Sequence, residues 1–166
     1  GREPRMSLEM LEHFVKEYIR ANDVQDVYFN WHGGEPLLMG LDFYGKAVEL
    51  QKKYAEGKTV HNTLQTNGTL ITREWAEFFR DNRFLIGVSL DGPKSVHDMY
   101  RNGKAGASTF DRVIKGMAEL YRARVDYNVM ATVNKQSEGK GLEIYQLLKS
   151  VGTRFIQFMP VVEHVK

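Results

Sequence analysis

The residues best suited to chemistry lie in short polar or glycine-containing clusters, each directly after an apolar run. Five clusters share this arrangement: Trp31-His32-Gly33-Gly34-Glu35-Pro36, Thr66-Asn67-Gly68, Ser89-Leu90-Asp91-Gly92-Pro93, Thr132-Val133-Asn134 and Met159-Pro160. If the runs are parallel strands, their carboxyl ends share one edge, and the clusters meet at one site. The pattern predicts a bound ligand that is approached by backbone at the glycines.

The first cluster gives the sharpest signal. Gly33 and Gly34 permit positive φ and close backbone approach, Glu35 offers an anionic partner for an ammonium group, and Pro36 fixes the exit of the chain. A simple tight turn is the alternative, but the other clusters expected at the same edge favour a site. His32 is the one histidine that we expect near the ligand.

The third cluster brings a hydroxyl and a carboxylate together. Ser89 and Asp91 are expected on one side of the chain and Leu90 on the other, so the pair could hold a polar ligand. An Asp-Gly-Pro turn is the alternative. Arg101, in the glycine-rich connection 91–107, could bind an anion as a bidentate donor, although most loop arginines are solvated. A serine hydrolase is disfavoured, because the sequence has no G-x-S-x-G elbow and Ser89 has no evident base. No catalytic residue is identified.

Metal and thiol chemistry within the chain is not expected. The five histidines include no i, i+4 pair, so no metal-binding residue is predicted. Cysteine is absent from the 166 residues, which excludes disulfides and thiolate ligands among them. Redox chemistry would therefore need a bound cofactor or additional sequence.

Bulk composition predicts one domain, residues 1–166, with an ordinary hydrophobic content of 42%. A net charge of only +2 with scattered basic residues argues against a nucleic-acid partner. No apolar run is long enough for a membrane span, and no signal-peptide pattern opens the chain, so we expect a cytoplasmic protein. The chain begins at Gly1 without a methionine, which predicts that it is a piece of a longer protein.

The elements that must position these clusters alternate between strand and helix. Expected helices begin at Ser7, Asp42, Thr72 and Ser108 or Thr109, each of these residues acting as a cap, and a fifth spans about 138–151. Expected strands are 27–31, 60–65, 84–90, 125–132 and 154–159. Alternation predicts an α/β fold with a parallel sheet. A doubly wound sheet remains possible, but no phosphate-loop motif follows the first strand, so we favour a partial (β/α) barrel with one N-terminal strand absent.

Taken in order, several motifs resemble those of the radical S-adenosylmethionine enzymes, and of the anaerobic sulfatase-maturating subgroup in particular. The matching segments are Gly33-Gly34-Glu35-Pro36, Leu64-Gln65-Thr66-Asn67-Gly68, Val88-Ser89-Leu90-Asp91-Gly92-Pro93 with His97-Asp98 and Arg101, Asn128 to Asn134, and Phe155 to Pro160. The resemblance covers about Ser7 to Glu163.

The resemblance implies a partial barrel that binds S-adenosylmethionine and a 4Fe-4S cluster. Gly33, Gly34 and Glu35 would meet the methionine ammonium, Ser89 and Arg101 its carboxylate, and the backbone near Val161 or Val162 the adenine. His32 stands where relatives often have glutamine. The cluster's three cysteines, in a loop after the first family strand, are not in this chain, so these residues alone are expected to be inactive.

The activity implied is oxidation of a serine or cysteine in a sulfatase polypeptide to formylglycine through a deoxyadenosyl radical. No general base is identified. Two alternatives stay open: a radical enzyme that modifies another peptide, and a cluster-free α/β binding module.

Overall fold

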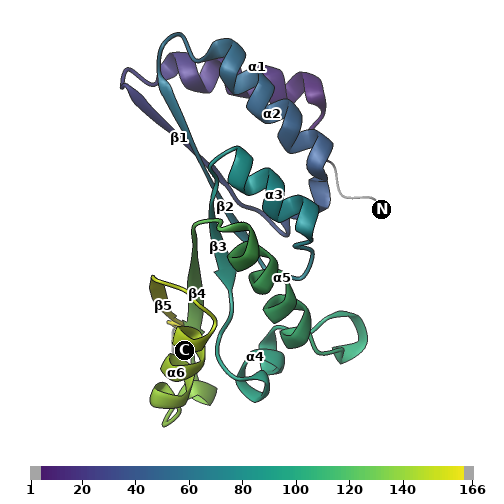
Figure 1. Ribbon diagram of the computed structural model, residues 1–166, viewed down its shortest axis with the longest axis vertical. Coiled ribbons are helices and arrows are strands. Elements are labelled where there is room, and N and C mark those ends of the chain that lie inside the picture. The colour runs from purple at the N-terminus through teal and green to yellow at the C-terminus, as the bar shows by residue number, and fades with distance from the viewer. Residues whose placement is uncertain (1–4, 163–166) are drawn as a thin grey trace.

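The strands of the sheet lie side by side in the same order in which they occur along the chain. The computed structural model describes residues 5–162, and its five strands pair in parallel in the order β1-β2-β3-β4-β5. A doubly wound sheet reverses its strand order at a switch point, and this sheet does not. The fold is thus a curled half-barrel, as the partial-barrel prediction expected (Figure 1).

Helices connect the strands and cover one side of the sheet (Figure 1). The elements are α1 (Leu8–Ala21), β1 (Asp26–Trp31), η1 (Pro36–Met39), α2 (Leu41–Tyr54), β2 (Thr59–Thr66), α3 (Arg73–Asp81), β3 (Leu85–Ser89), α4 (Lys94–Tyr100), η2 (Lys104–Gly106), α5 (Phe110–Ala123), β4 (Tyr127–Val133), η3 (Lys135–Ser137), α6 (Gly141–Ser150) and β5 (Ile156–Pro160). The expected strands match β1 to β5 within two residues.

The two faces of the sheet differ in burial because side chains alternate along each strand. Val27 and Phe29 of β1 are buried toward the helices, whereas Tyr28 between them is 53% exposed. On β3, Ile86 is buried and Leu85 is 41% exposed. Among the described residues, the second face of the sheet is therefore the more open one.

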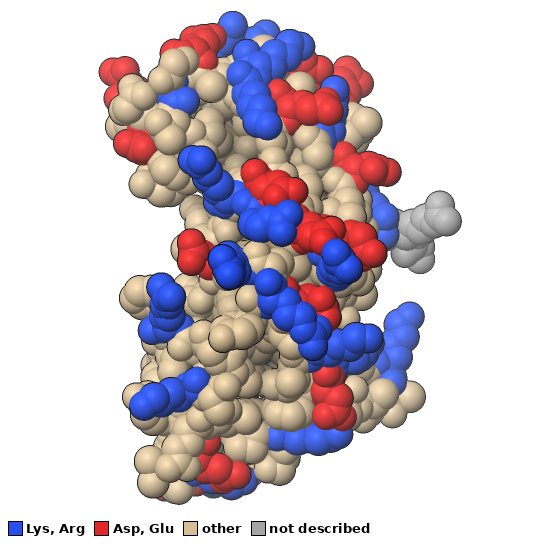
Figure 2. Space-filling view, viewed as in Figure 1, with Lys and Arg blue, Asp and Glu red and all other residues tan. Residues whose placement is uncertain are grey.

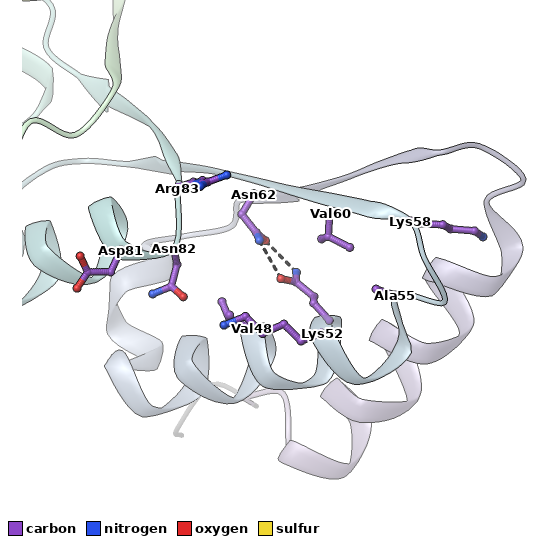
Figure 3. Close-up of a pocket in the computed structure, with 10 residues that line it drawn as sticks. Val48, Lys52, Ala55, Lys58, Val60, Asn62, Asp81, Asn82 and Arg83 are labelled. Carbon is purple, nitrogen blue, oxygen red and sulfur yellow. Dashed lines mark hydrogen bonds between the residues drawn. The ribbon is translucent and has the colours of Figure 1, made fainter.

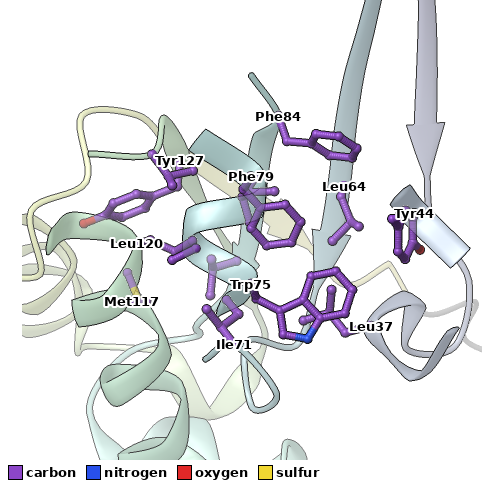
Figure 4. Close-up of a cluster of buried hydrophobic side chains, with 14 of the residues drawn as sticks. Leu37, Tyr44, Leu64, Ile71, Trp75, Phe79, Phe84, Met117, Leu120 and Tyr127 are labelled. Atoms are coloured by element: carbon purple, nitrogen blue, oxygen red, sulfur yellow. The ribbon is translucent and has the colours of Figure 1, made fainter. Parts of the chain in front are cut away.

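The core lies between the sheet and its helices (Figure 4). Trp75 and Phe79 of α3 stack with ring centroids 5.3 Å apart, and Tyr44 of α2 meets Trp75 edge-on at 5.7 Å. Phe84 completes this aromatic group against Phe79. Such pairs add about 0.5–1.5 kcal/mol each beyond the area they bury, so α2 and α3 are held firmly behind β2 and β3.

Two capping predictions were confirmed, one was wrong, and one was right in position only. Ser7 and Thr72 accept hydrogen bonds from Met10 N and Trp75 N as predicted. Asp42 is not the cap of α2, because that helix begins one residue earlier, after Gly40 at φ +86, and Asp42 lies in its first turn. Thr109 occupies the N-cap position of α5 as predicted, but its side chain makes no capping hydrogen bond.

The long connection 91–107 contains a helix that the sequence pattern did not predict. Helix α4 spans only seven residues, so it offers too few turns to show a clear 3.6-residue periodicity. Its Val96 and His97 are nevertheless buried. The expected helix at 138–151 is also shorter than predicted, because η3 and a turn at Gly139 (φ +73) precede α6.

Candidate ligand site at the carboxyl edge of the sheet

Direct contacts join the polar clusters that follow β1 and β2. The Glu35 carboxylate accepts hydrogen bonds from Thr66 Oγ1 at 2.7 Å and Asn67 N at 2.8 Å, and also from Leu37 N at 3.1 Å. Tyr44 Oη donates to the Pro36 carbonyl at 3.1 Å, and burial raises the pKa of this phenol. The first cluster is thus tied to the second strand and to α2.

Within the first cluster, the two glycines face open space. A Cβ atom on Gly33 or Gly34 would meet nothing within 4 Å, and Gly33 has φ +153, which L residues rarely adopt. His32 Nδ1 accepts from Gly33 N at 2.8 Å, which points the imidazole back along its own loop. The backbone here is open to a ligand.

We expect Glu35→Gln to lower the free energy of unfolding by about 1–2 kcal/mol. The NH2 group of the glutamine would replace one carboxylate oxygen and face at least one of the three N–H or O–H donors that now bond to Glu35. Urea denaturation measures this change. The matched control is Glu49→Gln, which changes an exposed carboxylate paired with Lys46 and should alter stability by less than about 0.5 kcal/mol. Equal effects of the two variants would show that the Glu35 contacts contribute nothing.

The clusters after β3 and β4 are joined by a buried ion pair. Asp91 is 3% exposed, and its carboxylate accepts from Arg101 Nε at 2.7 Å and from Thr132 N at 2.8 Å. Arg101 also donates through Nη2 to Thr132 Oγ1 at 3.0 Å, and its side chain is 29% exposed. The structure therefore brings the predicted residues Asp91 and Arg101 together. The Arg101 side chain nevertheless remains partly exposed.

A chain of hydrogen bonds closes the connection 91–110 on itself. Asp91 N donates to His97 Nδ1 at 3.4 Å, His97 Nε2 lies 3.0 Å from Thr109 Oγ1, and Thr109 Oγ1 donates to the Arg101 carbonyl. The directions agree only if His97 is neutral with its proton on Nε2. Burial lowers the pKa of His97, which is consistent with that state.

Asp98 performs the capping role that was predicted for Ser108 or Thr109. Its Oδ1 accepts from Thr109 N at 2.9 Å and Phe110 N at 3.1 Å, and Ser108 Oγ donates to Oδ2. Burial acts to raise the pKa of Asp98, but these three hydrogen bonds outweigh it and lower the pKa. The carboxylate thereby fixes the start of α5 against α4.

The neutral His97 predicts a pH dependence of stability. Since the folded state lowers its pKa, the unfolded chain takes up the proton first as the pH falls below about 6.5, and stability decreases there by up to about 1.4 kcal/mol per pH unit. The contribution is fully present above that pH. We expect His97→Gln to show a flatter urea-denaturation profile between pH 7 and 5, and parallel profiles for the two proteins would contradict the assignment.

The remaining predicted residues lie at the same edge. Ser89, the last residue of β3, is 8% exposed and accepts a hydrogen bond from Gln65 Nε2 at 3.2 Å. Val161 N donates to the Val133 carbonyl at 2.9 Å, which extends the pairing of β5 beyond Pro160, and Val162 is 79% exposed at the end of the described chain. The contacts of His32, Gly33, Gly34, Glu35, Ser89, Asp91, Arg101 and Val162 with a ligand stay predictions.

Four side chains at this edge were not among the predicted ligand-binding residues, although each lies in a segment that carried the resemblance: Gln65, His97, Asp98 and Thr132. Only Gln65 left a local signal, because Gly87 stands in the interior of a strand, where glycine often marks a close approach of another group. The partners of His97, Asp98 and Thr132 lie 6 to 41 residues away in the sequence, and no local pattern encodes them.

Two surface hollows lie away from this edge. One, of about 390 Å³, is lined by residues of α2, β2 and the turn after α3, and the paired amides of Gln51 and Asn62 form part of its wall (Figure 3). The other, of about 1070 Å³, lies at the amino ends of β3 and β4. Neither contains a predicted site residue.

Comparison with known proteins supports the resemblance seen in the motifs. The model of the Radical SAM superfamily matches residues 1–148. A serine-type anaerobic sulfatase-maturating enzyme of Bacteroides thetaiotaomicron is 49% identical over 160 residues, which are 96% of this chain and 39% of that protein. A cysteine-type enzyme of Clostridium novyi is 38% identical over 96% of this chain and 43% of its own length.

A solved structure has the same fold. Native anSMEcpe with bound AdoMet and Kp18Cys peptide superposes with a TM-score of 0.91 at 34% identity, covering 95% of this chain and 44% of that one. The chain thus spans about two-fifths of the length of the relatives it matches.

Proposed function

The chain belongs to the radical SAM superfamily, and we propose that the protein acts as an anaerobic sulfatase-maturating enzyme. Its activity would be the oxidation of a serine or cysteine side chain in a sulfatase polypeptide to formylglycine, with S-adenosylmethionine (AdoMet) and a 4Fe-4S cluster as cofactors. The observation that carries the proposal is the convergence of four motif clusters at one sheet edge. Glu35, after β1, contacts Thr66 at the end of β2, and Asp91, after β3, contacts Thr132 near the end of β4.

The residues at this edge fit the amino-acid part of AdoMet. Backbone at Gly33 and Gly34 is open, so amide and carbonyl groups can approach an ammonium group. Arg101 presents a partly exposed guanidinium and Ser89 a hydroxyl, both suited to a carboxylate. Bound with its cluster, AdoMet would supply a carbon-centred radical that removes hydrogen from the β-carbon of the substrate.

The cluster itself finds no ligand in this chain, because its 166 residues contain no cysteine. We therefore assign no residue here to the cluster. The role we propose for these residues is to bind and orient AdoMet at the carboxyl edge.

We propose a polypeptide as the partner. The similar solved structure contains a peptide, and the mixed charge of the surface is compatible with one. Basic and acidic side chains are interleaved on the face in Figure 2, without the single-sign patch expected of a nucleic-acid surface. Within residues 5–162, no helix is long and apolar enough to cross a membrane. We propose the cytoplasm as the compartment, since its reducing conditions suit an iron-sulfur enzyme.

The test is turnover by the full-length, cluster-loaded protein under anaerobic conditions. Two sulfatase peptides, one with serine and one with cysteine at the target position, are incubated with AdoMet and a one-electron reductant. Formation of the aldehyde, trapped with a hydrazide and located by mass spectrometry, supports the proposal. Higher identity to the serine-type relative favours the serine peptide. Cleavage of AdoMet with both peptides unchanged would overturn the sulfatase assignment.

A further inference from the structure

At a glycine in the middle of β3, a side chain from the neighbouring strand lies over the backbone of β3. Gly87 pairs with Gln65 of β2 and Asn128 of β4, and its φ lies outside the positive range, so its backbone does not require glycine. A Cβ atom there would lie 1.9 Å from Gln65 Oε1 and 2.9 Å from Gln65 Cδ. Glycine leaves this space to the Gln65 carboxamide, and any larger residue at position 87 would require the carboxamide to move.

The carboxamide lying over Gly87 reaches the next site residue on β3. Gln65 Nε2 donates to Ser89 Oγ at 3.2 Å, and Ser89 is 8% exposed. Within the described part of the chain, Ser89 Oγ has no other hydrogen-bond partner. A serine hydroxyl has one hydrogen and two lone pairs. Because Gln65 fills a lone pair, the Ser89 hydrogen remains free to be donated elsewhere.

We propose that Gln65 is a positioning residue that fixes the Ser89 hydroxyl as a donor to the carboxylate of AdoMet, with Gly87 providing the room for it. The inference rests on the proposed function, in which Ser89 contacts that carboxylate. Without Gln65, the hydroxyl can rotate and lose its orientation before the ligand arrives. The effect of Gln65 therefore passes through Ser89 and through the ligand's carboxylate.

The test measures AdoMet affinity of the full-length, cluster-loaded protein by anaerobic calorimetry. Gln65→Met keeps the length of the side chain and removes its donor, so the dissociation constant should rise by about three- to tenfold. In a Ser89→Ala background the same substitution should have no further effect. The control is Thr63→Val, which lies on the same face of β2 but bonds Asn30, and it should leave the affinity unchanged.

An AdoMet analogue that lacks the carboxylate separates positioning from a general structural role. Gln65→Met should bind decarboxylated AdoMet as well as the wild type does. A second measurement concerns folding: Gly87→Ala should destabilise the protein, and Gln65→Ala in the same chain should restore part of the loss, since it empties the colliding space.

The possible results separate a failure of the proposed function from a failure of the role proposed for Gln65. Wild-type protein that does not bind AdoMet would overturn the proposed function and this inference with it. Wild-type protein that binds AdoMet, with effects of Gln65→Met and Ser89→Ala that simply add, would overturn the inference alone. A loss of affinity equal for AdoMet and its decarboxylated analogue would do the same.

Discussion

Replacement of Arg101 by alanine is expected to lower the free energy of unfolding by about 3–5 kcal/mol. The reason is the carboxylate that the substitution leaves behind. Asp91 is 3% exposed, and among residues 5–162 it would keep only the backbone hydrogen bond from Thr132 N. An uncompensated buried charge costs far more than the ion pair contributes. Urea denaturation at neutral pH measures the loss.

Two further variants make the result specific. Arg73→Ala removes an exposed arginine from an i, i+4 pair with Glu77 and should change stability by less than about 0.5 kcal/mol. Adding Asp91→Asn to Arg101→Ala removes the stranded charge and should recover part of the loss. A similar small effect of Arg73→Ala and Arg101→Ala would contradict the buried-pair interpretation.

The second large effect is expected at Gly116, where α5 crosses the turn that follows β2. A Cβ atom at this position would lie 2.5 Å from the Gly68 carbonyl oxygen and 3.0 Å from Ile71 Cβ. Gly68 cannot easily retreat, because it has φ +75 and packs against Val88 and Val113. We expect Gly116→Ala to lower the free energy of unfolding by about 2–3 kcal/mol, although alanine favours helix by about 1 kcal/mol.

Gly45→Ala is the matched control, because Gly45 also lies inside a helix, α2, and a Cβ atom there would meet nothing within 4 Å. This change should stabilise the protein by about 0.5–1 kcal/mol. Opposite signs for the two substitutions, measured by urea denaturation, would confirm close packing at α5. If both variants were stabilised, the predicted contact between Gly116 and Gly68 would be absent in solution.

Strand positions and the parallel sheet could be predicted from the sequence, because a polar, glycine or proline cluster ends or follows each strand. The apolar signal itself was weakest in β2, where only Val60 and Leu64 of eight residues are apolar. The local sequence pattern predicted helix caps less well, because a cap depends on partners that are distant in the sequence. Asp42 has the chemistry of a cap, but the chain enters α2 through η1 and Gly40, so the helix starts before it. Thr109 also has capping chemistry, but its hydroxyl is bonded to the Arg101 carbonyl, and Asp98 supplies the cap instead.

For the candidate site, residue types were predicted but not their pairings. Arg101 was expected to meet an anion, and the anion that it meets in the structure is Asp91, ten residues earlier. That pairing becomes visible only once β3, α4 and β4 are placed together. Glu35 likewise contacts residues about 31 positions away. Long-range contacts of this kind leave no periodic trace in the sequence.

The self-closed connection 91–110 has a consequence for local motion. Amide hydrogens of Asp91, Thr109, Phe110 and Thr132 all donate to side chains of the same network, formed by His97, Asp98 and Asp91. Breaking one of these hydrogen bonds frees a side chain that also accepts or orders the others. Segment 91–110 is therefore expected to open locally as one cooperative unit and not to fray from one end. Deuterium should therefore exchange into these four amides at a common rate. The same opening would move the Arg101 guanidinium away from its place at the edge of the sheet, and closing would return it.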